Sequence, residues 1–205
     1  PKMSVQQLRE VERRICQALE RLPGPMKGSY TSMRAVMADM ALQEELERAE
    51  LPQTYRLTES AGMLSAWPEG RGIFLNADRS LCIFVNVEDH LTVVCTANAG
   101  GGAKKAQDAL ELAESVLNAL SASLSFEFDP VLGYITPSPA KLGTALAFSL
   151  VLTLPPVLSA EQVEGIEERF PQVCVEVDGE GGGAAHGCIV FSRLSLGITE
   201  VDAIR

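Results

Sequence analysis

No apolar run in the sequence approaches the ~20 residues that a helix needs to cross a bilayer, so we expect no membrane-spanning segment. The first residues, PKMSVQQLREVERR, also lack the apolar stretch of a secretory signal. The chain lacks an initiator Met and stops at EVDAIR, which is typical of a helix cut short. We therefore expect the 205 residues to be a piece of a longer cytoplasmic polypeptide.

Basic residues are also few, because 17 Lys and Arg stand against 27 Asp and Glu, for a net charge of −10. Nucleic acids bind proteins mainly through Lys and Arg, so a nucleic-acid partner is not expected. The five cysteines are odd in number and form no CxxC or Cys/His cluster, which argues against a zinc site. We expect reduced thiols, no metal and no cofactor.

The first half of the chain changes from helical to strand periodicity. Ser4 and Gln7 form a capping box before an apolar helical repeat that ends at Leu22. Residues 33–50 also read as a helix, with a stripe of methionines that we interpret as core. Four short apolar runs with tight turns then predict sequential antiparallel strands: Met63–Trp67, Gly72–Asn76, Leu81–Val87 and Leu91–Ala97.

A helix over 104–120 should cover one face of this sheet through the apolar positions Ala106, Leu110, Ala113, Leu117 and Leu120. The second half predicts strands near Gly133–Thr136, Leu146–Leu154, Val173–Val177 and Cys188–Ser192, and helices that begin at Ser159 and Thr199. Strands in runs, with helices between them, favour an α+β fold. We predict a single domain over 1–205, with a helical lead-in over 1–60 and the sheet and its helices over 61–205.

Three polar motifs could carry chemistry. The cluster NAGGGAKK lacks the spacing of a phosphate-binding loop, so we interpret it as a flexible connection. His186 stands in a second glycine-rich loop, Gly179–Gly187, without a visible base or metal partner. The triplet Glu88-Asp89-His90 places a carboxylate beside a histidine at a hairpin end, which could provide a general base but is also typical of a solvated turn.

Several segments resemble the guanidino (phosphagen) kinases. WPEGRGIFLNADRSLCIFVNVEDHL, over 67–91, is similar to WPxGRGIxxNxxxxFxxWxNEEDHLR of arginine and creatine kinases. GYITPSPAKLGTALAFSLVLTLP, over 133–155, is similar to GFLTxCPxNLGTxxRAxVHxxLP, and LGITEVDAI, over 196–204, to LGLTExxAV. MKGSY corresponds to LKGxYxxL. The resemblance implies the family's catalytic-domain fold, an antiparallel sheet flanked by helices and related to glutamine synthetase.

The resemblance also implies a reaction, the transfer of the γ-phosphoryl group of ATP to a guanidine. Carboxylates must orient the guanidinium, and arginines must hold the phosphates. The four alignable arginine positions carry Thr92, Ala147, Val175 and Asp178 here. The strand with the remaining phosphate arginines, the family's first, would precede this chain. Glu88 and, in a less certain alignment, Glu180 match the family's glutamates, whereas Val87, Ser138 and Lys141 replace a glutamate, a cysteine and an asparagine.

One arginine can be worth about 10³–10⁵ in the rate of phosphoryl transfer. We therefore expect no enzyme activity and no useful ATP binding, and we interpret Glu88 and Glu180 as vestigial. The predicted function is a protein-interaction scaffold in a larger assembly, of which a cytoskeletal lattice is one candidate, with a partner covering an open sheet edge. The alternative is a sensor that binds arginine or a similar guanidino ligand near Glu88. An enzyme completed by another chain's arginines is disfavoured by Asp178.

Overall fold

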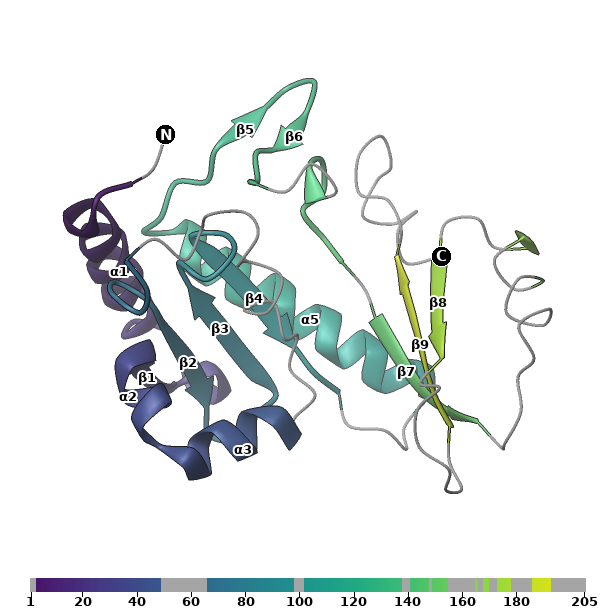
Figure 1. Ribbon diagram of the computed structural model, residues 1–205. Coiled ribbons are helices and arrows are strands. Elements are labelled where there is room, and N and C mark those ends of the chain that lie inside the picture. The colour runs from purple at the N-terminus through teal and green to yellow at the C-terminus, as the bar shows by residue number, and fades with distance from the viewer. Residues whose placement is uncertain are drawn as a thin grey trace. The chain divides into compact units, whose positions relative to one another are not determined.

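The computed structural model describes residues 3–48, 66–97, 102–137, 141–147, 149–154, 165, 168–169, 173–177 and 186–192 (Figure 1). The chain divides into two compact units, Pro1–Ser125 and Phe126–Arg205. The first unit combines an antiparallel sheet with helices, and the second contains antiparallel strands, so the predicted α+β class is confirmed.

The first unit opens with helix α1, Val5–Leu19, and its predicted capping box is confirmed. Gln7 N donates to Ser4 Oγ at 3.2 Å, and Ser4 N donates to Gln7 Oε1 at 2.8 Å. A 3₁₀ turn, Gly24–Met26, leads into strand β1, Gly28–Ser32. This strand lies inside the predicted helical lead-in and was missed, because its five residues carry no apolar alternation.

A four-stranded antiparallel sheet forms the centre of the first unit, in the order β1-β2-β3-β4. Strands β2 (Gly72–Asn76), β3 (Leu81–Val85) and β4 (Leu91–Cys95) confirm three of the predicted runs as sequential neighbours. The fourth neighbour is β1, paired with β2 from Gly28↔Asn76 to Ser32↔Gly72. The prediction of a strand up to Trp67 is wrong in its described part, because Ala66 and Trp67 belong to a turn with Gly70 at φ +67°. Residues 63–65 lie outside the described residues.

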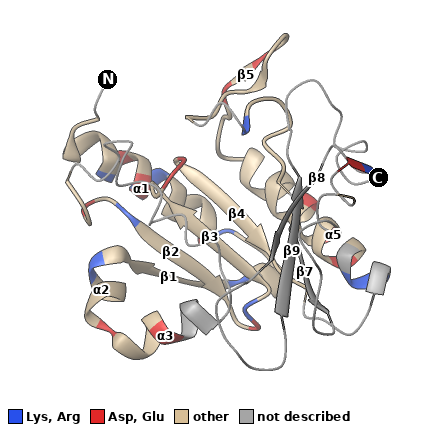
Figure 2. Cartoon of the chain, turned by 45° about the vertical axis from the view of Figure 1, so that its right-hand side comes forward, with Lys and Arg blue, Asp and Glu red and all other residues tan. Residues whose placement is uncertain are grey.

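Both faces of β2 and β3 are buried, which makes the first unit three-layered. Phe74, Ile83 and Val85 pack with α1 and with helix α5, Gly102–Ser121. The opposite face packs with Met33 and Val36 of helix α2, Met33–Ala38. Figure 2 shows that β2, β3 and β4 carry no Lys, Arg, Asp or Glu; β2 and β3 are buried on both faces, where an unpaired charge would be costly.

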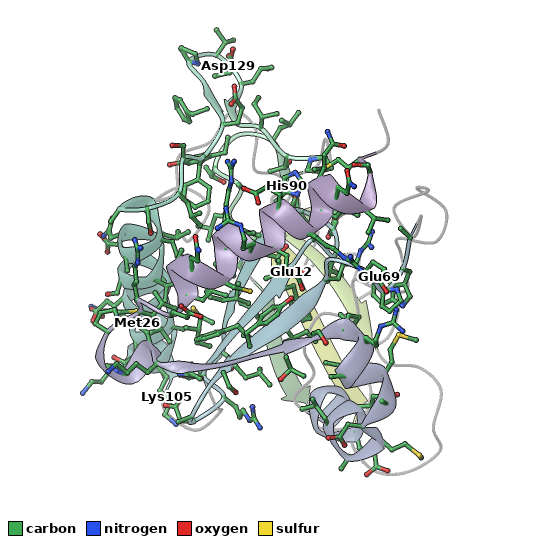
Figure 3. The ribbon with its side chains drawn as sticks, turned by 90° about the vertical axis from the view of Figure 1, so that its left-hand side faces the viewer. Glu12, Met26, Glu69, His90, Lys105 and Asp129 are labelled. Carbon is green, nitrogen blue, oxygen red and sulfur yellow. The ribbon has the colours of Figure 1, made fainter. Side chains whose placement is uncertain are left out.

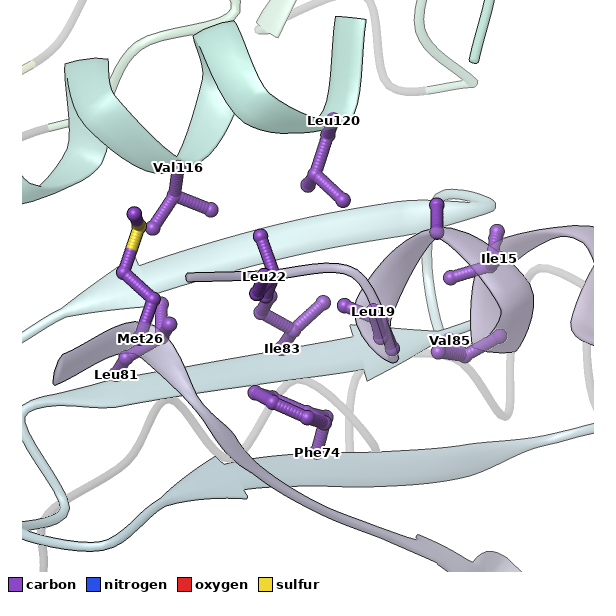
Figure 4. Close-up of a cluster of buried hydrophobic side chains, with 11 residues drawn as sticks. Ile15, Leu19, Leu22, Met26, Phe74, Leu81, Ile83, Val85, Val116 and Leu120 are labelled. Atoms are coloured by element: carbon purple, nitrogen blue, oxygen red, sulfur yellow. The ribbon is translucent and has the colours of Figure 1, made fainter. Parts of the chain in front are cut away.

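Helix α5 covers the sheet as predicted, and of the predicted inward positions Leu120 is buried and Leu110 and Ala113 are half-buried, whereas Leu117 is not. Val116 and Leu120 are fully buried, and both point toward the strands in Figure 4. Leu117 is 44% exposed, although the sequence places it on the inward face. Val116, one residue earlier and therefore about 100° away around the helix, is buried in its place.

The predicted helix over 33–50 is two helices, α2 and α3 (Met40–Arg48), that meet at Asp39. Asp39 leaves the helical conformation, with φ −113° and ψ 96°, and its Oδ1 accepts a hydrogen bond from Leu42 N at 3.1 Å. The methionine stripe is therefore not all core: Met33 is buried, whereas Met37 and Met40 are exposed.

The second unit contains a hairpin and a three-stranded antiparallel sheet. Strands β5 (Phe128–Asp129) and β6 (Gly133–Tyr134) form the hairpin, so the strand predicted over 133–136 is shorter. The sheet has the order β7-β9-β8, with β7 at Ser149–Leu154, β8 at Val173–Val177 and β9 at His186–Ser192. The prediction for β8 is confirmed, and β7 begins three residues later than predicted.

Strand β9 begins at His186, so His186 and Gly187 belong to a strand and not to the predicted glycine-rich loop. Of the helix predicted from Ser159, Gly165, Glu168 and Arg169 are helical, and its other residues lie outside the described residues. The helix predicted from Thr199 also lies outside them. Within the described part of the chain, no helix is long and apolar enough to cross a membrane.

Candidate functional site

The candidate site is the turn of residues 86–90, which joins β3 to β4 and carries Glu88. Asn86 begins the turn with φ +55°, a conformation that asparagine tolerates better than most residues, and its backbone N donates to His90 O at 3.1 Å. Glu88 and Asp89 are half-buried, and His90 is exposed. The hairpin therefore holds two carboxylates and an imidazole within three consecutive residues.

The side chain of Asn86 connects this turn to two other segments. Its Nδ2 donates to Leu8 O in α1 at 3.0 Å and to Gly70 O at 2.6 Å. Its Oδ1 lies 2.8 Å from His90 Nδ1. Asn86 itself is only 5% exposed, so its bonds to Leu8 O and Gly70 O are buried, whereas its contact with the exposed His90 is partly buried. Figure 3 shows His90 beside α1.

The turn of residues 66–70 forms the neighbouring wall. Glu69 bonds to Arg9 of α1 at 2.6 Å and to Arg34 of α2, and these two arginines lower the pKa of its carboxyl group (Figure 3). Gly70 packs against α1 so closely that an added Cβ would lie 2.8 Å from Leu8 Cβ. Arg71 is buried, with its guanidinium 5.5 Å from the centre of the Trp67 ring, and burial lowers its pKa.

The structure brings some of the predicted site residues together. Glu88 and Thr92 share the β3–β4 hairpin, where Thr92 lies opposite Phe84. The buried Thr92 Oγ1 has no hydrogen-bond partner among the described residues. Val87, next to Glu88, is buried in the core.

The other predicted positions belong to the second unit. Ala147 is exposed and precedes β7, and Val175 lies in β8 opposite Val190. Lys141 is half-buried in a short turn. Ser138, Asp178 and Glu180 lie outside the described residues. The described structure therefore establishes a common local frame for Glu88 and Thr92 only.

Sequence reasoning missed Asn86, although it included the residue in the NVEDHL motif. The available signal was an asparagine directly after a buried strand and before an acidic triplet, where a positive φ and side-chain hydrogen bonds are common. It also missed the ion pairs of Glu69 with Arg9 and Arg34, because these residues are far apart in sequence and no pattern links them.

An antiparallel α+β fold with a Glu-Asp-His hairpin beside a Gly-Arg-Gly turn defines a guanidino-kinase-type catalytic domain. The family model "ATP:guanido phosphotransferase, C-terminal catalytic domain" matches residues 10–205. The chain belongs to this family.

Relatives of known type match over most of the chain. Arginine kinase of Liolophura japonica is 26% identical over all of this chain and 58% of its own length. Taurocyamine kinase of Schistosoma mansoni is 29% identical over 95% of this chain and 26% of its own length. The chain therefore spans about half, or less, of these relatives.

Solved structures support the same fold. The substrate-free duplicated taurocyamine kinase from Schistosoma mansoni superposes with a TM-score of 0.81 and 28% identity, over 100% of this chain and 28% of that one. Lombricine kinase superposes with a TM-score of 0.76 and 24% identity, over 98% of this chain and 56% of that one, and this likeness concerns the fold alone.

The prediction that the chain is not an enzyme is contradicted by these relatives, which are arginine and taurocyamine kinases. That prediction required Thr92, Ala147, Val175 and Asp178 to surround one phosphate site. Among the described residues, only Thr92 lies in the same hairpin as Glu88. The four replaced positions therefore do not demonstrate that one phosphate site has been lost. Substitutions at positions with no common frame are weak evidence against an activity.

Proposed function

We propose that the chain is the catalytic-domain part of a phosphotransferase that moves a phosphoryl group between ATP and a guanidino compound. The observation that carries the proposal is the family match over residues 10–205, together with Glu88 on the β3–β4 turn. The substrate class follows from the relatives, since arginine and taurocyamine are both guanidino compounds.

In this proposal Glu88 contacts the guanidinium group of the substrate. A carboxylate accepts two parallel N–H bonds from a guanidinium, which fixes both the position and the plane of the group. The same carboxylate can accept the proton that the attacking nitrogen loses. Glu88 is half-buried, and partial burial strengthens a carboxylate–guanidinium pair by limiting competition from water.

The nucleotide should bind weakly. Thr92 and Ala147 are neutral, Val175 is apolar and Asp178 is acidic, where the resemblance implies arginines. An arginine that stabilises the transferred phosphoryl group can contribute about 10³–10⁵-fold to the rate. We therefore expect slow turnover and no micromolar Mg·ATP binding in calorimetry; saturable micromolar binding would contradict this part of the proposal.

The test is a phosphoryl-transfer assay with ATP and, in turn, arginine and taurocyamine. Glu88→Gln should abolish turnover, because it removes the charge but keeps the size of the side chain. Glu114→Gln, an exposed position on α5, is the matched control and should leave turnover unchanged. Absence of turnover with every guanidino compound would sink the proposal, and arginine binding without turnover would identify a ligand sensor instead.

We further propose that the second unit makes protein contacts through the β5–β6 hairpin, as a scaffold in a cytoplasmic, cytoskeleton-associated assembly. The hairpin exposes large apolar side chains: Val131 is 87% exposed and Phe128 is 58% exposed, with Phe128 stacked edge-on against Tyr134 at 5.1 Å. Contiguous exposed apolar groups of this kind mark interaction surfaces.

Sedimentation analysis tests the contact role. The chain should associate with itself or with a co-expressed partner, and Val131→Asp should weaken that association. Met40→Asp, at another exposed apolar position, is the control and should have no effect. A monomeric chain whose behaviour is indifferent to Val131→Asp would contradict the proposal.

A further inference from the structure

Three backbone segments converge on the amide of Asn86. Leu8 O comes from α1, Gly70 O from the 66–70 turn, and His90 closes the 86–90 turn. Each contact to the Asn86 amide is a directional hydrogen bond, in addition to the close packing of Gly70 against Leu8. The junction lies two residues from Glu88 at the start of its own turn.

The hydrogen-bond chemistry fixes which atom donates at each contact. The carbonyl oxygens of Leu8 and Gly70 can only accept, so the amide nitrogen of Asn86 must face them. The Oδ1 atom is then directed at His90, and because Oδ1 can only accept, His90 Nδ1 must carry a hydrogen. In the neutral imidazole, the lone pair is therefore on Nε2.

We propose that Asn86 is a positioning residue: its amide holds His90 as the Nδ1–H tautomer and so fixes the turn that presents Glu88 to the guanidino compound. This inference rests in part on the proposed function, because it assigns the turn a ligand. It adds a residue and a tautomer to that function. Asn86 acts through the turn and touches no substrate.

The chemistry explains why other residues would fail at this position. Aspartate could accept from His90, but its carboxylate would face the oxygens of Leu8 and Gly70 without a hydrogen to donate. Glycine would keep the positive φ without strain and remove the side-chain bonds alone. Asn86→Gly is therefore the variant that separates the amide from the backbone conformation.

The first experiment measures the tautomer by nitrogen-15 NMR of the imidazole rings. The chain has two histidines, so His186→Gln identifies the signals of His90. Near neutral pH the neutral ring of His90 should show a protonated Nδ1 and an unprotonated Nε2. Asn86→Gly should remove this preference and shift the backbone amides of residues 87–89. An Nε2–H tautomer in the unaltered chain, or spectra unchanged by Asn86→Gly, would overturn the proposal.

The second experiment uses Asn76 as a matched control, because it is a buried asparagine that pins the β2–β3 turn at the other end of the sheet. Its Nδ2 donates to Pro25 O at 3.2 Å and to Ser80 Oγ at 3.0 Å, and its Oδ1 accepts from Leu81 N at 2.9 Å. Asn86→Gly and Asn76→Gly should both lower the melting temperature, since each removes similar buried bonds.

Only Asn86→Gly should weaken the site. Measured well below both melting temperatures, it should raise the KM or Kd for free arginine about tenfold, the effect of losing one or two such bonds, while Asn76→Gly leaves it unchanged. Equal increases of the KM or Kd for arginine in the two variants would show that Asn86 has only a structural role, and would refute the proposal that it positions Glu88. If the unaltered chain binds no guanidino compound, the proposed function fails, and the NMR result still decides whether Asn86 sets the tautomer and the turn.

Discussion

Removing the side chain of Leu120 should destabilise the first unit far more than removing that of Leu117. The two leucines are three residues apart on α5, but Leu120 is fully buried among the strands and Leu117 is 44% exposed. The substitutions Leu120→Ala and Leu117→Ala delete the same atoms from the same helix. Differences in helix propensity therefore cancel, and the comparison isolates burial.

The magnitude follows from the packing. A Leu→Ala change in a core costs about 2–5 kcal/mol, because the cavity left behind adds to the lost transfer free energy. Leu120 contacts a cluster that includes Leu22 and Ile83, both nearly without exposed surface, so little collapse of the cavity is expected. Burying a whole leucine side chain contributes about 1.5–3 kcal/mol to stability. Leu117 is about half buried, so Leu117→Ala should cost about 1 kcal/mol.

Urea unfolding followed by Trp67 fluorescence measures both values. Trp67 is the only tryptophan of the chain and lies in the first unit, half-buried beside Arg71. We expect a lower midpoint for Leu120→Ala with an unchanged slope, and a small shift for Leu117→Ala. Equal losses of stability, or a larger loss at Leu117, would refute the described burial of Leu120 and exposure of Leu117.

Two further predictions follow from individual contacts. Gly72→Ala should lower the free energy of unfolding by about 1–3 kcal/mol, because the added Cβ would meet the ring of Tyr30 and lie 2.6 Å from Thr31 O. Tyr30→Phe should not restore the stability, because the ring remains. An unchanged melting temperature of Gly72→Ala would contradict the close approach of β1 and β2. Alkaline pH should destabilise the chain, because burial raises the pKa of the Cys82 thiol from 9.0 to about 12. The contribution of the neutral thiol to the free energy of unfolding is complete below about pH 9 and is lost between about pH 9 and 12, as the thiol of the unfolded chain ionises. Cys82→Ala should reduce the slope of stability against pH in this window.

Strands β2, β3 and β4 could be predicted because short apolar runs with tight turns allow few other structures, whereas β1 (Gly28–Ser32) contains no such run. β2 and β3 are continuous apolar runs bounded by turn residues, and turns this short allow only antiparallel neighbours. The face of α5 was harder, because Val116 and Leu117 are adjacent apolar residues and both fit a helical repeat. Which of them is buried depends on how the helix crosses the sheet, and local periodicity does not contain that angle.

The site was predictable in part. Glu88 could be placed at a hairpin end from the turn residues around it, and the structure has it there. The junction at Asn86 could not be predicted, because its partners Leu8 and Gly70 are backbone carbonyls. Every residue has such a carbonyl, so no side-chain pattern reveals that these two become acceptors. Such contacts become visible only when the fold brings α1 and the two turns together.

Motif residues that survive in a chain carry information about function only when packing does not already require them. Gly70 has a positive φ and lies against Leu8, and Gly72 faces Tyr30, so packing alone accounts for both glycines. Their presence is expected in an active enzyme and in an inactive relative alike. The replaced arginine positions do not decide activity either, because among the described residues only Thr92 lies in the same hairpin as Glu88. Substitution of Glu88 by glutamine, which removes the charge and keeps the size of the side chain, therefore tests the proposed activity more directly than substitution of the glycines.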